Sequence, residues 1–223
     1  MPRQPQPPAR PARRRSYDQF CAGARALDAV GDRWTLLIVR ELLAGPRRYT
    51  DLHADLPGVS TDVLASRLKD MEQSGLVVRR RLPPPAAATV YALTERGHGL
   101  LPVLAALAEW GAPALAERRP TDAVRAHWFA LPLLRVLDGV AIAGGVVDVH
   151  LDEGEFHVRT GRPAAGEPVY GDGPAERADA RIALDAELCL ALGRGELTFA
   201  EAVKDGRIEV SGDGPLAVGL RGD

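Results

Sequence analysis

Three polar side chains recur about one helical turn apart between residues 60 and 75. Asp62, Ser66 and Lys69 fall on one face of a helix predicted over residues 61–74, with Ser60 as its N-cap. The opposite face of this helix is apolar and consists of Leu64, Leu68 and Met71. Carboxylate, hydroxyl and ammonium groups on an outward helix face can bind base edges and phosphates in the major groove of DNA. The outward set is Thr61, Asp62, Ala65, Ser66 and Lys69, with Arg67 on its flank.

Further groups that could bind DNA phosphates lie before and after this helix. A short helix is predicted to begin at residue 49 or 50 and to end at Leu56, and the side chains at its start that could bind phosphates are Arg47, Arg48, Tyr49 and Thr50. The backbone amides that follow Ser60 suit an anion, because amides at a helix N-terminus lack partners within the helix. Two strands are predicted over residues 77–82 and 89–93, and the basic residues at the base of their ribbon are Arg79, Arg80 and Arg81.

The elements that position these residues follow a known order. A helix is predicted over residues 21–30, ended by Gly31, and a second over residues 33–43, capped by Asp32. The three compact helices over residues 33–43, 49–56 and 61–74, followed by a basic ribbon, are typical of a winged helix-turn-helix. The sequence therefore predicts double-stranded DNA as a partner.

A long apolar helix is predicted after the ribbon, from Thr94 to about Glu117. Its apolar residues exceed one helical stripe, which indicates burial against a second subunit and hence a homodimer. The alternative is that this helix packs only against its own domain.

The charge of the chain is divided between its two halves. Residues 1–119 hold 18 Lys and Arg against 12 Asp and Glu, a net charge of +6, and residues 120–223 hold 10 against 18, a net charge of −8; the sum is the overall −2. DNA attracts the first half and repels the second. We therefore expect three segments: a basic arm over residues 1–15, a DNA-binding and dimerisation domain over 16–119, and a second domain over 120–223. The arm is expected to be disordered, and it either binds DNA phosphates or serves as a solubilising tail.

The C-terminal half predicts a small sheet with helices, so the fold class of the whole chain is α+β. Helices are predicted over 121–137, 186–192 (ended by Gly193) and 198–205, and strands over 145–151, 155–160, 180–184 and 207–211, with a terminal loop after them. The apolar residues that could line a ligand pocket are Trp128, Phe129, Leu133, Leu137, Phe156, Leu188 and Phe199. The same residues could instead form the domain core.

Other kinds of site find little support in the sequence. Cys21 and Cys189 form neither a metal cluster nor a disulfide framework, which fits a reducing, cytoplasmic location, and Cys189 lies among leucines that predict a core position. The five histidines lack metal-ligand spacing, and no catalytic motif or apolar membrane span is present. We expect no metal, no cofactor, no membrane association and no enzymatic activity.

Three segments of the N-terminal half, CAGARALDAVGDRWTLLIVREL, SRLKDMEQSGLV and VYALTERG, resemble the HxlR family of winged-helix regulators over residues 17–115. The resemblance implies a homodimeric DNA-binding repressor or activator. It also places Cys21 at the position that redox-sensing or electrophile-sensing members use, although a lone cysteine in a helix can equally be a buried hydrophobe. The tip of the ribbon departs from the family, because residues 85–88 carry no charge where members usually have a basic residue.

The segment ADARIALDAELCLALGRGELTFAEAVKDGRIEVSGD resembles the C-terminal half of sterol-carrier-protein-like domains, and the match spans residues 122–214. That resemblance implies a small apolar ligand. The principal hypothesis is a transcriptional regulator controlled by such an effector or by oxidation of Cys21. The alternative is a lipid or small-molecule carrier that keeps a vestigial winged helix.

Overall fold

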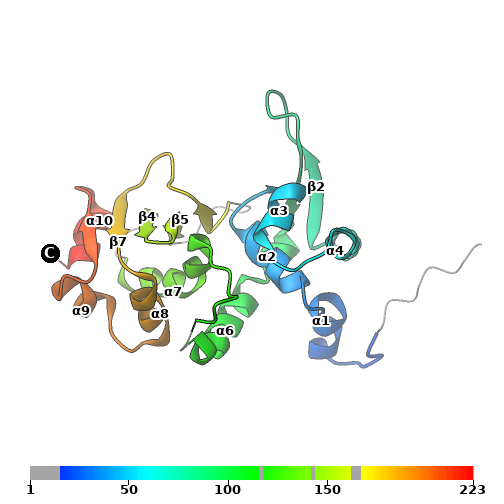
Figure 1. Ribbon diagram of the computed structural model, residues 1–223, viewed down its shortest axis with the longest axis horizontal. Helices are drawn as coiled ribbons and strands as arrows, with labels where there is room; N and C mark the ends of the chain where they lie inside the picture. The colour runs from blue at the N-terminus through cyan, green and yellow to red at the C-terminus, as the bar shows by residue number, and fades with distance from the viewer. Residues whose placement is uncertain (1–15, 116–117, 142–143, 162–166, 223) are drawn as a thin grey trace, which may run out of the picture.

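The computed structural model describes residues 16–115, 118–141, 144–161 and 167–222 (Figure 1). The arm predicted over residues 1–15 and the predicted helix end at Glu117 lie outside the described residues. None of the described helices combines the length and the apolar character that a membrane crossing requires.

The N-terminal part contains the helices of the predicted helix-turn-helix. They are α1 (Ala22–Val30), α2 (Thr35–Leu43), α3 (Tyr49–Asp55) and α4 (Thr61–Gln73). Ser60 caps α4 as predicted, since its Oγ accepts the Val63 amide at 3.3 Å. Helix α2 begins two residues later than predicted, and Asp32 accepts the amides of Trp34 and Thr35 at 2.9 and 3.1 Å in the turn just before it.

A three-stranded antiparallel sheet completes the winged helix. Its strands are β1 (Arg47–Arg48), β2 (Val77–Arg81) and β3 (Thr89–Leu93), in the order β1-β3-β2. Strands β2 and β3 form the predicted ribbon, whereas the two-residue strand β1 is too short to leave a pattern in the sequence. The ribbon extends well beyond α3 in Figure 1.

The prediction of one continuous helix from Thr94 is wrong, because this segment is broken into shorter helices. It consists of α5 (Glu95–His98), α6 (Leu101–Gly111) and the 3₁₀ turn η1 (Ala112–Leu115). Pro102 lacks an amide hydrogen and therefore lies in the first turn of a new helix. A Cβ at Gly97 would collide with the Leu76 carbonyl oxygen, so only glycine allows α5 to lie this close to the backbone of Leu76.

The C-terminal part is a five-stranded sheet with helices packed on it. The strands are β4 (Gly145–Leu151), β5 (Gly154–Thr160), β6 (Tyr170–Asp172), β7 (Ala180–Ala183) and β8 (Glu209–Ser211), in the order β6-β5-β4-β7-β8. Among the described residues, β4 and β7 pair in parallel and the other neighbouring strands of this sheet pair antiparallel. The helical elements are η2 (Ala126–Phe129), α7 (Ala130–Val140), α8 (Ala186–Arg194), α9 (Phe199–Lys204) and α10 (Pro215–Arg221).

Four predictions for this part need correction. The helix predicted from residue 121 begins only at η2, because Arg125 is extended and reaches back to α3. Helix α8 ends at Gly195, which takes a left-handed φ of 71°, and not at Gly193. The predicted terminal loop is helix α10, which begins at Pro215. Strand β6 lies in a Gly/Pro-rich stretch that predicted no strand.

One continuous hydrophobic cluster runs through both parts of the chain. It includes Ile38, Leu52 and Leu68 from the winged helix as well as Leu133, Phe156 and Leu188 from the C-terminal part. The boundary at residue 120 stays a prediction. Because they share this cluster, the two parts pack against each other and are not joined only by a linker.

Candidate nucleic-acid interface

Helix α4 presents the polar face that the sequence predicted. Leu64, Leu68 and Met71 are at most 1% exposed, so that side of the helix is the packed one. The exposed side chains are Thr61, Asp62, Ala65, Ser66 and Lys69. Sequence reasoning missed Val63, which is 39% exposed beside Asp62. Val63 lies one turn before Arg67 and outside the apolar stripe of α4, and this position in the sequence could have indicated that its side chain is exposed.

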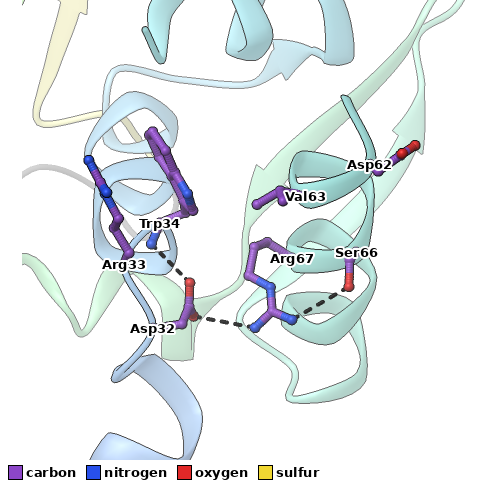
Figure 2. Close-up of a pocket in the computed structure, with 7 residues that line it drawn as sticks. All are labelled: Asp32, Arg33, Trp34, Asp62, Val63, Ser66 and Arg67. Carbon is purple, nitrogen blue, oxygen red and sulfur yellow. Dashed lines mark hydrogen bonds and ion pairs between the residues drawn. The ribbon is translucent and has the colours of Figure 1, made fainter. Parts of the chain in front are cut away.

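Two contacts fix α4 relative to the preceding helices. The Tyr49 hydroxyl donates to the Thr61 carbonyl oxygen at 2.7 Å and so joins the start of α3 to the start of α4. The Arg67 guanidinium lies 2.8 Å from Asp70 and 3.8 Å from Asp32. Figure 2 shows Arg67 reaching from α4 toward Asp32 at the beginning of α2. Arg67 is therefore a positioning residue in this arrangement.

A hollow of about 420 Å³ lies between the start of α2 and α4. Figure 2 shows the side chains around it, which are Asp32, Arg33, Trp34, Asp62, Val63, Ser66 and Arg67. It lies alongside the exposed face of α4, so we treat it as part of the same surface.

The four candidates at the start of α3 divide into two exposed side chains, Arg48 and Thr50, and two half-buried ones that make contacts within the protein, Arg47 and Tyr49. Arg48 and Thr50 are exposed, and the Arg48 amide donates to Asp51 at 3.2 Å. The Arg47 side chain is only 16% exposed and lies 3.4 Å from Asp172 in the C-terminal part. A phosphate contact from Arg47 stays a prediction that this geometry does not favour.

The ribbon carries exposed cations along one strand. Arg79, Arg80 and Arg81 are exposed on β2 and pair in register with residues 91, 90 and 89 of β3. Because side chains alternate along a strand, Arg80 points to the opposite face from its two neighbours. In Figure 1 the ribbon and α4 lie on the side of the molecule away from α7–α10. The exposed basic candidates of α4 and the ribbon thus lie away from α7–α10 (Figure 1), whereas Arg47 contacts Asp172 of the C-terminal part.

Cys21 lies at the N-terminal end of α1 and is exposed. Hydrogen bonds from the backbone amides of Ala24 and Gly23 lower the pKa of the Cys21 thiol below its ordinary value. Arg25, one helical turn after Cys21, lies 3.8 Å from Asp28 and is paired with that carboxylate. Cys189 is buried as predicted, and burial raises the pKa of its thiol.

The predicted pocket residues of the C-terminal part form its packed interior. Leu133, Leu137, Phe156, Leu188 and Phe199 are at most 3% exposed, Phe129 is half-buried against the hydrophobic cluster, and Trp128 is half-buried. A ligand among these side chains stays a prediction. The described residues contain no group of three or more His, Cys, Asp or Glu side chains able to hold a metal ion.

Sequence reasoning missed a buried polar contact between the two parts. The Glu41 carboxylate of α2 is fully buried and accepts hydrogen bonds from Arg40 at 2.8 Å, from the Trp128 indole at 2.9 Å and from His127 at 2.7 Å. The Arg40 guanidinium also stacks 4.1 Å from the centre of the Trp128 ring. We call Arg40, Glu41, His127 and Trp128 the junction cluster.

The pKa of Glu41 reflects two opposing influences. Burial raises this pKa, but the hydrogen bond from His127 and the charge of Arg40 outweigh burial, and the pKa of Glu41 is lowered overall. Glu41 is therefore ionised at neutral pH. Nearby, the Tyr170 hydroxyl donates to the Arg40 carbonyl oxygen at 2.5 Å, and Arg125 donates to the Ala54 carbonyl oxygen at 3.2 Å.

Comparison with known proteins agrees with this geometry. The family model of HxlR-like helix-turn-helix proteins matches residues 29–119. The uncharacterized HTH-type transcriptional regulator YvaP of Bacillus subtilis is 38% identical over 86 residues, which are 39% of this chain and 80% of YvaP. The HTH-type transcriptional regulator YodB of the same organism is 36% identical over 85 residues, 38% of this chain and 76% of YodB.

A solved structure of the reduced form of YodB is 34% identical and covers 42% of this chain and 92% of its own, with a TM-score of 0.38. The matched region of the family model contains α2, α3, α4 and the ribbon, and it stops before the C-terminal part. On the identity and coverage of YvaP and on this model, the chain belongs to the HxlR-like family of helix-turn-helix proteins.

Proposed function

We propose that this chain is a homodimeric, sequence-specific transcriptional regulator whose helix α4 binds in the major groove of double-stranded DNA. The observation that carries the proposal is the exposed polar face of α4, held against α2 and α3 and flanked by a basic ribbon. The relatives YvaP and YodB are HTH-type transcriptional regulators, which supports the same role here.

The exposed apolar side chains of α1 and α6 support the homodimer. Leu27 is 52% exposed, Val103 and Leu107 are each 44% exposed, and Trp110 is 84% exposed. Large apolar side chains grouped on helices are unusual on the surface of a monomer and are typical of a subunit interface. A twofold pair would present two copies of α4 to successive major grooves.

Most of the candidate residues have a role in this proposal. Thr61, Asp62, Ala65 and Ser66 face base edges, Lys69 and Arg48 bind phosphates, and Arg79, Arg80 and Arg81 bind the backbone beside the groove. Val63 joins this set, since an exposed aliphatic side chain can contact a thymine methyl group. Arg67 holds α4 in place.

We also propose that the C-terminal part is a sterol-carrier-like domain that controls DNA binding, with oxidation of Cys21 as a second route of control. The order β7, α8, α9, β8 supports the resemblance, and the exposed Cys21 thiol with its lowered pKa supports the second route.

A salt titration tests the DNA-binding proposal. Fluorescence anisotropy with a duplex from upstream of the chain's own gene should show affinity that falls linearly with salt on logarithmic axes. Lys69→Gln should reduce that slope by about 0.9, the value for one lost phosphate contact. Lys204→Gln, on the exposed face of α9, is the matched control and should leave the slope unchanged. Equal slopes for the two variants, or no specific binding, would contradict the proposal.

A further inference from the structure

A second hollow, of about 320 Å³, lies where α6 of the winged helix meets α7 and β5 of the C-terminal part. Its apolar walls are Leu101 and Ala105 from α6, Leu131 and Leu134 from α7, and Val169 before β6. Pockets for small molecules begin at about this volume and have mainly apolar walls with a few polar groups. The hollow therefore suits a small molecule with an apolar body.

Within the described residues, one of the two arginines that line this hollow, Arg159, forms no ion pair. Arg135 is paired, since its Nη1 lies 2.5 Å from Glu109, and Asp138 accepts the Gly161 amide at 3.0 Å. The Nε of Arg159 is buried and has no hydrogen-bond partner in the part of the chain that the structure describes. A buried donor without an acceptor is unfavourable, and the guanidinium of Arg159, which lines the hollow and forms no ion pair with a described carboxylate, can take an anionic ligand as its partner.

We propose that this hollow binds a small apolar monocarboxylate, with its acid group on Arg159 and its apolar body between α6 and α7. A guanidinium matches the planar geometry of a carboxylate and forms charge-assisted hydrogen bonds with it. The carboxylate of Asp138 borders the same hollow and disfavours an anion with more than one charge. This site is distinct from the interior of the C-terminal part, because none of the residues predicted for that pocket lines the hollow.

The position of the site gives it a route to the DNA-binding surface, and this step rests on the proposed function. Helix α6 forms one wall of the hollow and also carries the exposed apolar residues assigned to the dimer contact. A ligand wedged between α6 and α7 would bind one spacing of these helices better than another. Such differential affinity is what coupling between two sites requires.

Calorimetric titration of the full chain with octanoate and with its neutral analogue octanamide tests the site. We expect octanoate to bind once per chain and at least about tenfold more tightly than octanamide, because only octanoate provides a charged acceptor. Arg159→Gln should reduce the affinity for octanoate to that for octanamide, and Ala105→Phe should weaken both ligands by filling the hollow. Arg177→Gln is the matched control, since Arg177 is exposed and lies outside the hollow.

Equal affinities for the acid and the amide, no binding, or unchanged octanoate affinity in a folded Arg159→Gln variant would overturn the proposal. Circular dichroism establishes folding, and Arg159→Lys, which keeps the charge and loses the planar fork, should give an intermediate affinity.

The coupling is read from DNA affinity with and without octanoate, in wild type and in Arg159→Gln. We expect at least about a fivefold change in wild type and none in the variant. Salt-dependent DNA binding that ignores octanoate refutes the coupling and leaves the proposed function standing. Absence of DNA binding in all conditions refutes the proposed function, while the calorimetric result for the hollow holds by itself.

Discussion

The junction cluster supplies the sharpest prediction, which is that Glu41→Gln destabilises the protein strongly. The carboxylate accepts hydrogen bonds from three side chains, and all of them lie within 3.0 Å of its oxygens. A glutamine can keep the oxygen that faces Arg40 and Trp128, but its NH₂ group then faces the Nε2 of His127, which can accept only in the other tautomer. The half-buried Arg40 also loses its counter-charge.

The expected loss of unfolding free energy is about 3 kcal/mol. Removing one partner of a buried ion pair costs about 3–5 kcal/mol. The lower end of that range applies here, because the Arg40 side chain is 16% exposed and still stacks on the Trp128 ring after the change. Adding the hydrogen bonds one by one would give a larger figure, but bonds to a shared acceptor are not additive.

Urea unfolding at pH 7, followed by tryptophan fluorescence, measures this loss, and Trp128 lies inside the cluster that the substitution disturbs. Glu155→Gln is the matched control. Glu155 is 46% exposed and lies 3.1 Å from His150, so its loss should cost no more than about 1 kcal/mol. A Glu41→Gln variant that loses less than about 1 kcal/mol, or no more than the control, would refute the reasoning.

The same cluster sets a pH dependence. Because the pKa of Glu41 is lowered in the folded protein, the stability that its ionisation provides is fully present above the unfolded value of about 4.3. It is lost as the pH falls through the folded pKa. The difference in stability between wild type and Glu41→Gln should therefore shrink below about pH 4.3, and a difference that grows on acidification would contradict the assignment.

Three further predictions concern the winged helix. Iodoacetamide should alkylate Cys21 in the native protein with half-maximal rate at a pH below that of an ordinary thiol, whereas Cys189 should react only after unfolding; mass spectrometry of the labelled peptides distinguishes the two. Tyr49→Phe removes the hydrogen bond to Thr61 and should cost about 1 kcal/mol in urea unfolding, with weaker DNA binding, and unchanged values for both would show that α4 does not depend on this contact. Asp32→Ala removes a helix cap and should cost about 1 kcal/mol by the same measurement, whereas Asp32→Asn should retain most of the stability.

The elements that were predicted well are those whose signals are local. The apolar spacing of Leu64, Leu68 and Met71 and the cap at Ser60 specify α4 almost to the residue. The β-branched residues around an Asp-Glu-Gly turn likewise specify the β4–β5 hairpin. In both cases the information lies within a short run of neighbouring positions.

The features that were missed depend on distant residues. Glu41 occupies a buried position of α2, and its partners His127 and Trp128 lie 86 and 87 positions further along the chain. The apolar periodicity therefore shows a charged residue on the buried face of the helix but does not identify its partners. Strand β6 pairs with β5 through backbone groups, which leave little trace in a Gly/Pro-rich sequence. Arg47 was expected on DNA because its type suits phosphate, and only the fold places it beside Asp172.

Helix α2 connects two contacts that lie at its opposite ends. Asp32, just before its first turn, holds Arg67 of α4, and Glu41, near its last turn, holds the C-terminal part. Nine helical residues span about 14 Å, so the two attachments are joined by a short rod without a hinge. The orientation of the C-terminal part relative to α4 is therefore fixed. If the chain binds a promoter as proposed, the C-terminal part would exclude neighbouring proteins from one defined side of the bound site. A domain on a flexible linker would instead exclude them weakly from many directions.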